Sequence, residues 1–185
     1  MTPKQTIKPL ITDCKVVAQS RLFRIEQVDL TFSNGTKVEY ERLRGSNRGG
    51  VLVVALLDKD TLLMVREYGV GVERHELMFP KGRIENDEPI EEAANRELQE
   101  EVGYAARKLT LIKSMTLAPG YMGHLTHVVL AEDLYPASLE GDEPEPLEVV
   151  QWRLDEIDNL AMQEDVSEAR TIAAAYIVKA LLDKR

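Results

Sequence analysis

The chain has 185 residues and a formal net charge of −9, because 32 Asp and Glu outnumber 23 Lys and Arg. A chain of this length forms one domain, or a domain with a small extension, and buries roughly 70% of its unfolded surface without a disulfide or structural metal. Its acidity argues against general binding of nucleic acid, which needs a basic surface that releases counterions. The charge is compatible with plain solubility, or with a phosphate-bearing substrate whose contact a divalent cation mediates.

Cysteine content and hydropathy restrict the cellular setting. Cys14 is the only cysteine, so neither an intrachain disulfide nor a CxxC metal site is possible. The first residues, MTPKQTIKPLITD, lack the continuous apolar core of a signal peptide. The longest apolar run, Val51–Leu57, is far too short to span a bilayer. We therefore expect a cytoplasmic protein whose partners include neither a membrane nor a nucleic acid.

Two segments near the N-terminus are predicted to form a β-hairpin. Ser20–Phe32 and Thr36–Leu43 have strand-like sequences, and the residues SNG between them favour a turn. A polar loop, Gly45–Gly50, follows the hairpin. We place a boundary within this loop, between an N-terminal hairpin unit, residues 1–47, and a main domain, residues 48–185.

The main domain is predicted to have an α+β fold. Val51–Leu57 has the continuous apolar sequence of a buried strand. Five further strands are predicted, at Thr61–Arg66, Glu76–Phe79, Leu109–Lys113, Thr126–Ala131 and Val149–Arg153. Three helices are predicted, at Pro89–Val102, Asp155–Leu160 and Ser167–Leu182. Asp165 and Glu168 have the spacing of a capping box at the start of the last helix. These elements indicate a mixed sheet with helices packed on it.

The first of these helices has three glutamates on the side expected to face inward. At roughly 100° per residue, Ala94 and Leu98 belong to one apolar arc of the helix. Glu97 and Glu101 fall within that arc and Glu100 lies at its edge, whereas the other polar residues lie on the opposite side. Like charges at these spacings repel each other, and their burial is costly unless something compensates them.

Two compensations are possible: the pKa values of the carboxyls rise until they are neutral, or a cation binds. Carboxylate oxygens on one rigid helix face suit Mg²⁺ or Mn²⁺. The alternative is a solvated acidic patch on a loosely packed helix. Arg96 is near the same face and can form an exposed ion pair with Glu92. It can instead pair with Glu88 in the preceding loop, which would hold the Gly82 backbone near the metal.

The spacing of these residues resembles that of a known family. Gly82 is followed after five residues by Glu88, and after seven more by the sequence RELQEEVGY, which begins at Arg96. Every fixed position of the Nudix box, GX5EX7REUXEEXGU, is therefore filled. Nudix enzymes use divalent cations to hydrolyse a nucleoside diphosphate linked to another moiety.

The resemblance implies a Nudix-type α/β/α sandwich behind the N-terminal hairpin unit. It implies that Mg²⁺, with Mn²⁺ as an alternative, is the cofactor. It further implies that the metal ligands are Glu97, Glu100, Glu101 and a backbone carbonyl at or beside Gly82. Glu88 and Arg96 would form a structural bridge.

Features outside the box resemble the Nudix subgroup of ADP compounds hydrolases and ADP-ribose pyrophosphatases. Pro119, sixteen residues beyond Gly103, is similar to a downstream proline of that subgroup, and EGDEPEPLE at Glu140–Glu148 is similar to its acidic loop. The phrases SRLF, VREY, AANREL and DLYP–SLEGDEPEPL extend the resemblance over nearly the full chain. It implies a small nucleotide as substrate (ADP-ribose, NADH or a diadenosine polyphosphate), AMP and X-phosphate as products, and a homodimer built by the N-terminal unit.

In the mechanism that this resemblance implies, a cation-activated water attacks phosphorus and a loop glutamate takes the proton. Glu145 is favoured over Glu143 for that role, so the expected catalytic residues are Glu100, Glu101 and Glu145. A solvated acidic loop is the alternative for this segment. Two other functions remain open: a Nudix hydrolase of nucleoside triphosphates or capped RNA, and a nucleotide-sensing Nudix module without catalysis.

The substrate contacts are inferred from one departure of this chain from the subgroup. Where the subgroup often has Gln–Tyr–Arg, this chain has Glu67–Tyr68–Gly69, so one arginine that contacts phosphate or ribose is missing. Arg66 or Arg83 is expected to take its place. Three aromatic residues could form an adenine platform or belong to the core: Phe23, Phe32 and Tyr121.

Overall fold

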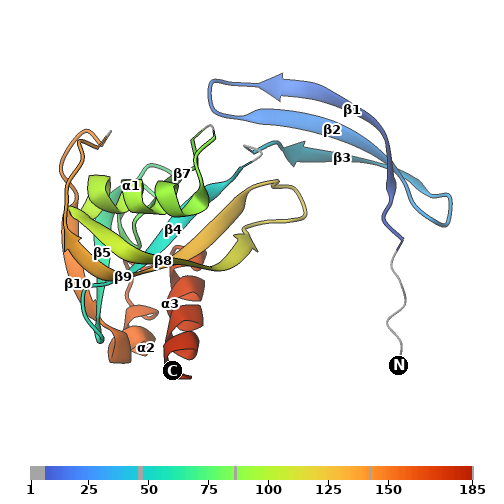
Figure 1. Ribbon diagram of the computed structural model, residues 1–185. Coiled ribbons are helices and arrows are strands. Elements are labelled where there is room, and N and C mark those ends of the chain that lie inside the picture. The colour runs from blue at the N-terminus through green and yellow to red at the C-terminus, as the bar shows by residue number, and fades with distance from the viewer. Residues whose placement is uncertain (1–6, 46–47, 86, 142, 185) are drawn as a thin grey trace. The chain divides into compact units, whose positions relative to one another are not determined.

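Figure 1 shows the protein, a computed structural model that describes residues 7–45, 48–85, 87–141 and 143–184. The chain divides into two compact units, residues 1–47 with 116–124 and residues 48–115 with 125–185. The first unit thus includes a segment that the sequence assigned to the main domain, and the domain boundary at residue 47 stays a prediction. Two residues of the expected polar loop, Ser46 and Asn47, lie outside the described residues. Within the described ranges, no helix is long and apolar enough to cross a membrane.

The described part of the first unit forms an antiparallel three-stranded sheet in the order β1–β2–β3. Its strands are β1 (Leu10–Gln19), β2 (Arg24–Thr31) and β3 (Lys37–Leu43). The predicted hairpin corresponds to β2 and β3, and Gly35 in its turn has a φ of 82°. Strand β2 begins later than predicted because Ser20–Phe23 form a turn, in which the Phe23 N–H donates to the Ser20 hydroxyl (2.9 Å).

Strand β1 was not predicted, so the N-terminal unit is a three-stranded sheet and not only a hairpin. Its pairing with β2 shifts register between Ile11 and Asp13 and again between Val16 and Ala18. Each shift changes which face the following side chains point to, so the alternation that marks a strand is interrupted. All ten residues of β1 are also exposed, so no buried face imposes an apolar pattern.

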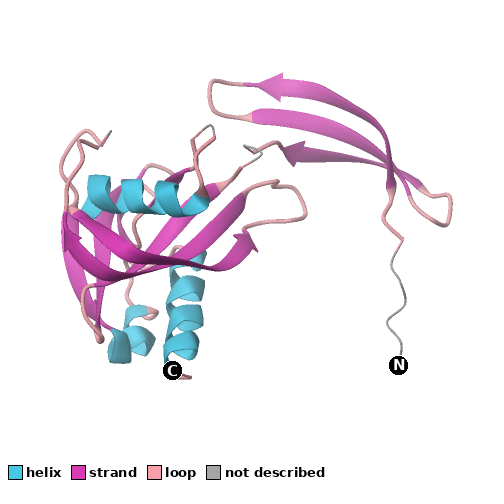
Figure 2. Ribbon diagram, in the orientation of Figure 1, coloured by secondary structure: helices cyan, strands magenta, loops and turns pink. Residues whose placement is uncertain are grey.

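The described part of the second unit contains a mixed seven-stranded sheet (Figures 1 and 2). Five strands follow the order β10–β5–β4–β9–β8, while β6 pairs with β5 and β7 pairs with β4. Their bounds are β4 (Gly50–Leu56), β5 (Thr61–Gly69), β6 (Arg74–Met78), β7 (Lys81–Arg83), β8 (Tyr104–Thr116), β9 (Leu125–Pro136) and β10 (Glu148–Arg153). β4 and β9 run parallel, whereas β5 is antiparallel to β4, β6 and β10.

The two faces of this sheet are covered by different helices. Leu52 of β4 belongs to the hydrophobic cluster that includes α3 (Ala169–Leu182), whereas its neighbour Val53 belongs to the cluster that includes α1 (Ile90–Val102). Figure 2 shows α1 and α3 on opposite sides of the sheet. Every residue of β4 is buried, which explains its continuously apolar sequence. The predicted α+β fold, an α/β/α sandwich with a mixed sheet, is confirmed.

Helix α1 has the predicted extent to within one residue. Pro89 is its N-cap in an extended conformation, and Gly103 closes it with a φ of 76° in the left-handed region that glycine adopts readily. The predicted helix Asp155–Leu160 is observed as a 3₁₀ turn, Leu154–Glu156, followed by α2 (Ile157–Leu160).

Helix α3 begins at Ala169, two residues later than predicted, and the predicted capping box is wrong. Glu168 itself is the N-cap, and its carboxylate accepts hydrogen bonds from the Thr171 N–H (2.9 Å) and hydroxyl (2.7 Å). Asp165 does not cap the helix, because its carboxylate pairs with Arg66 of β5. This ion pair connects the segment before α3 to strand β5.

Candidate active site

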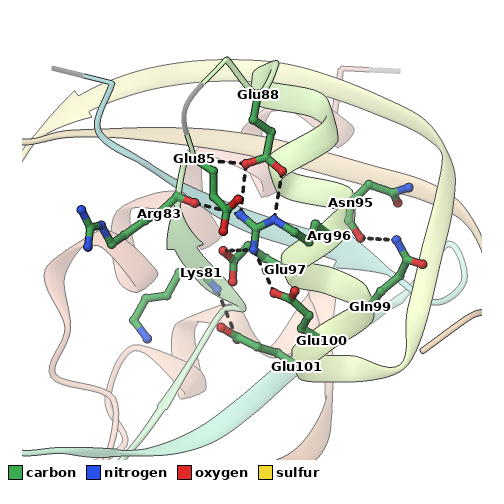
Figure 3. Close-up of polar contacts among 10 residues, drawn as sticks. All are labelled: Lys81, Arg83, Glu85, Glu88, Asn95, Arg96, Glu97, Gln99, Glu100 and Glu101. Carbon is green, nitrogen blue, oxygen red and sulfur yellow. Dashed lines mark hydrogen bonds and ion pairs between the residues drawn. The ribbon is translucent and has the colours of Figure 1, made fainter. Parts of the chain in front are cut away.

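The three glutamates of α1 face strand β7, which lies beside the buried strand β4. The pairing of Val51 with Gly82 fixes β7 on the edge of β4. Figure 3 shows Glu97, Glu100 and Glu101 on the side of α1 that faces this strand. Glu97 is only 8% exposed, and the other two glutamates are partly buried. The inward direction expected from the helical wheel is therefore observed.

Arg96 connects several groups of the site, because all five of its N–H groups donate hydrogen bonds. Its Nε and Nη2 bond the two oxygens of Glu88 at 2.9 and 3.1 Å, and Nη2 also bonds the Arg83 carbonyl at 2.9 Å. Its Nη1 bonds Glu97 at 2.8 Å and Glu100 at 2.9 Å. The ion pair expected between Arg96 and Glu88 is present. One guanidinium thus joins helix α1, strand β7 and the loop between them (Figure 3).

Glu88 fastens that loop to the helix. Hydrogen bonds from Arg96, together with the Glu85 N–H, hold the pKa of its carboxyl below the ordinary value although burial opposes this shift. The carboxylate is therefore ionised at neutral pH and remains a partner for the guanidinium. A bidentate pair of this kind fixes both distance and orientation, which a single contact does not.

Gly82 allows Glu97 to lie directly on the backbone of β7. A methyl group at residue 82 would lie 2.0 Å from the Glu97 carboxyl carbon and from one of its oxygens. No side chain fits in that space unless the carboxylate moves. The glycine is therefore required for the close approach of strand and carboxylate and not for an unusual φ angle.

The surroundings of Glu101 disfavour the charged form of its carboxyl. Burial raises its pKa to about 8, and the nearby charges of Glu97 and Glu67 add to the rise, although Lys81 opposes it. The Lys81 backbone N–H lies 3.3 Å from one Glu101 oxygen. A raised carboxyl pKa beside other carboxylates is the environment in which a cation would bind favourably.

Lys81 and Glu67 are site residues that the sequence analysis did not identify. The Lys81 ammonium pairs with the Glu67 carboxylate, and both side chains are less than one-quarter exposed. Leu63 and Val65 of β5 belong to the α1 cluster, and the alternation of the strand places Glu67 on that same face. The link between β5 and β7 therefore lies beside Glu101.

Arg66 lies on the opposite face of β5. Leu62 and Met64 belong to the α3 cluster, and the same alternation places Arg66 with them. Its guanidinium pairs there with Glu148 (3.0 Å) and with Asp165. The structure thus does not bring Arg66 together with the α1 glutamates, and its contact with substrate stays a prediction of the sequence.

Arg83 contributes its backbone carbonyl to the site. Its carbonyl accepts a hydrogen bond from Arg96, and it pairs with Gly50 of β4 in the sheet. In Figure 3 the Arg83 side chain points away from the carboxylates of α1.

The acidic loop between β9 and β10 begins against the C-terminal half of α1. The Leu139 N–H donates to the Gln99 carbonyl (3.3 Å), and Gly141 lies next to the Glu100 backbone. Glu143 and Glu145, the two candidates for the general base, follow in this loop and are exposed. Asp142 of the same loop lies outside the described residues.

The remaining predicted residues lie in the first unit, residues 1–47 with 116–124. Pro119 and Tyr121 belong to the 116–124 segment and, with Phe32, line a pocket of about 520 Å³ within that unit. Leu43 of β3 fastens the segment through its N–H, which donates to the Tyr121 carbonyl (2.8 Å). Phe23 is 52% exposed and does not line this pocket.

The donor set fits a hard divalent cation. Three carboxylates on one side of α1 face a backbone that Gly82 keeps accessible, and oxygen ligands of this kind are the ones that Mg²⁺ and Mn²⁺ prefer. Among the described residues, no three acidic, histidine or cysteine side chains are already arranged around a common metal position. Arg96 pairs with oxygens of both Glu97 and Glu100, so a cation would compete with this guanidinium.

Comparison with known proteins agrees with this geometry. Two family models match the chain: a NudE-type Nudix hydrolase N-terminal domain over residues 9–42 and a NUDIX domain over residues 46–176. The chain therefore belongs to the Nudix hydrolase family.

Individual relatives cover nearly the whole chain. It is 49% identical over 176 residues to the ADP compounds hydrolase NudE of Escherichia coli (strain K12), over 95% of this chain and 94% of that protein. It is 33% identical to the ADP-ribose pyrophosphatase of Bacillus subtilis (strain 168), over 90% and 91% of the two chains. A crystal structure of an ADP compounds hydrolase matches with a TM-score of 0.91 and 48% identity, over 98% and 97% of the two chains.

The raised pKa of Glu101 predicts that stability depends on pH when no cation is bound. Between pH 4.5 and about 8 the carboxyl keeps its proton in the folded state and loses it in the unfolded chain. The unfolded state then binds fewer protons, so the free energy of unfolding falls as pH rises through this range and levels off above it. Glu101→Gln should lack this contribution and become the more stable form as pH rises.

This difference is measured by urea unfolding in EDTA at about pH 5, about pH 6.5 and about pH 8.5. A difference in unfolding free energy that does not change with pH would show that Glu101 titrates normally in the folded protein.

Proposed function

We propose that the protein hydrolyses compounds in which ADP is linked to another moiety, and that it releases AMP and the phosphate of that moiety. ADP-ribose, NADH and diadenosine polyphosphates are the proposed substrates. The observation that supports this most is the set of three α1 glutamates that face strand β7, two of which, Glu97 and Glu100, pair with Arg96. Two relatives that cover most of the chain, an ADP compounds hydrolase and an ADP-ribose pyrophosphatase, support an ADP-containing substrate.

A divalent cation, Mg²⁺ or Mn²⁺, is the proposed cofactor. Its proposed ligands are Glu97, Glu100, Glu101 and the backbone carbonyl of Gly82. When bound, such a cation neutralises charge on the pyrophosphate oxygens and lowers the pKa of a bound water. The protein's own contribution is to keep the three carboxylates on one side of α1, facing the β7 backbone, which reduces the ordering that the reaction itself requires.

Glu145 is the proposed general base, with Glu143 as the alternative. A base must come within hydrogen-bond reach of the attacking water. The attachment of Leu139 to Gln99 starts the acidic loop beside α1, which supports a glutamate of this loop in that role. Arg83, which is exposed at the end of β7, is the proposed contact for the part of the substrate beyond the pyrophosphate.

Initial rates on four substrates test the proposed activity. ADP-ribose, NADH, diadenosine triphosphate and a nucleoside triphosphate are each incubated with Mg²⁺ and, as a control, with EDTA. We expect AMP from the first three substrates in Mg²⁺, little turnover of the triphosphate, and none in EDTA, because the carboxylates need a cation to bind pyrophosphate. Faster turnover of the triphosphate, or equal rates in EDTA, would contradict the proposal.

A homodimer built by the N-terminal sheet is also proposed. Strand β1 exposes four large apolar side chains, Leu10, Ile11, Val16 and Val17, each at least 44% exposed. A long exposed edge strand with such residues is unfavourable in water unless another chain covers it.

Sedimentation equilibrium tests this assembly. We expect twice the mass of one chain, and a shift towards the monomer in Val16→Glu, because a charge would then have to be buried in the interface. Lys15→Gln on the same strand is the matched control and should remain dimeric. A wild-type protein that is monomeric at all concentrations would rule out the dimer.

A further inference from the structure

The pyrophosphate of the proposed substrate needs a positive partner that the site, as described so far, does not provide. Arg96 lies among the carboxylates, but each of its five N–H groups already has an acceptor. Arg66 lies on the other face of β5, where two carboxylates hold it. The Arg83 side chain points away from α1 (Figure 3). None of these three arginines is thus placed to receive a phosphate group beside the glutamates.

Lys81 meets the requirement that the arginines do not. Within the described ranges its ammonium has Glu67 as its only partner, so two of its three N–H groups remain available. Its backbone N–H reaches Glu101, and its positive charge acts on that carboxyl. The side chain is 19% exposed, so solvent and salt screen its charge less than that of a surface lysine.

We infer that Lys81 binds a phosphate oxygen of the substrate and that Glu67 orients its ammonium towards the α1 glutamates. The inference rests on the proposed function, because it needs a pyrophosphate substrate at these carboxylates. A charged hydrogen bond from an ammonium to phosphate is short and strong, and it leaves the Glu67 pair free to persist through another N–H. Lys81 thereby fulfils the role that the sequence suggested for Arg66 or Arg83.

A purely structural role for the pair makes a different prediction. If the ion pair only fastens β5 to β7, removal of either partner breaks the same contact and has the same effect. If Lys81 also binds substrate, loss of the ammonium weakens substrate binding, whereas loss of the Glu67 charge leaves the ammonium in place. The two single variants therefore distinguish the two roles.

The experiment compares wild type, Lys81→Gln, Glu67→Gln and Lys59→Gln in steady-state hydrolysis of ADP-ribose with Mg²⁺. Lys59, which is 90% exposed in its side chain, is the control for the loss of one positive charge. We expect Lys81→Gln to raise KM by roughly 10- to 100-fold, as the loss of a charged hydrogen bond does. Lys59→Gln should keep KM within about threefold of the wild-type value, and Glu67→Gln, which keeps the ammonium but loses its orienting partner, should raise KM by a clearly smaller factor than Lys81→Gln.

Calorimetric titration with ADP in the presence of Mg²⁺ gives a second measurement that does not need turnover. Lys81→Gln should weaken ADP binding by a similar factor, and Glu67→Gln should weaken it by a clearly smaller one. If the wild type binds ADP but hydrolyses none of the four substrates, the proposed function fails while this titration still decides the role of Lys81. Equal increases of KM and equal losses of Tm in Lys81→Gln and Glu67→Gln would overturn the inference. A raised KM in Arg66→Gln with an unchanged KM in Lys81→Gln would also overturn it.

Discussion

The site depends on the five hydrogen bonds of the Arg96 guanidinium. Helix α1 has three inward carboxylates whose mutual repulsion would otherwise push the helix away from the sheet, and Arg96 compensates two of them directly. The same group fixes Glu88 in the loop and the Arg83 carbonyl in strand β7. Because a planar guanidinium donates in fixed directions, helix, loop and strand are held in one arrangement. A lysine has neither enough donors nor the required planarity for this role.

This arrangement leaves a charge imbalance that suits a cation. Among the described residues Arg96 pairs with Glu97 and Glu100 and not with Glu101. Burial, together with the nearby charges of Glu97 and Glu67, raises the pKa of Glu101 to about 8, although Lys81 opposes the rise. Gly82 lets the Glu97 carboxylate approach the backbone that would supply a further oxygen ligand. The folded protein thus keeps the Glu101 carboxyl where its negative charge is unfavourable, and cation binding would relieve this. Such unfavourable placement of charge is common at functional sites.

Much of this could be predicted from the sequence because the residues involved are close together in it. The helical wheel gave the direction of the α1 glutamates, and the Glu88–Arg96 pair lies within a single loop and helix. Strand β7 has three residues, which is too short to show an alternating pattern. Alternation along β5 places Arg66 and Glu67 on opposite faces, but helices cover both faces, so sequence alone does not show which face meets α1. In β1, the register shifts interrupt the alternating pattern by which a strand is recognised in a sequence.

The central claim is that the α1 carboxylates bind the catalytic cation, and Mn²⁺ affinity measured by electron paramagnetic resonance tests it most directly. Glu101→Gln keeps the size of the side chain and removes its charge, whereas Glu92→Gln removes an exposed charge from the outer side of the same helix. We predict at least about tenfold weaker Mn²⁺ binding in Glu101→Gln, together with a loss of several orders of magnitude in hydrolysis rate, and wild-type values in Glu92→Gln. Wild-type Mn²⁺ affinity in Glu101→Gln would contradict the account.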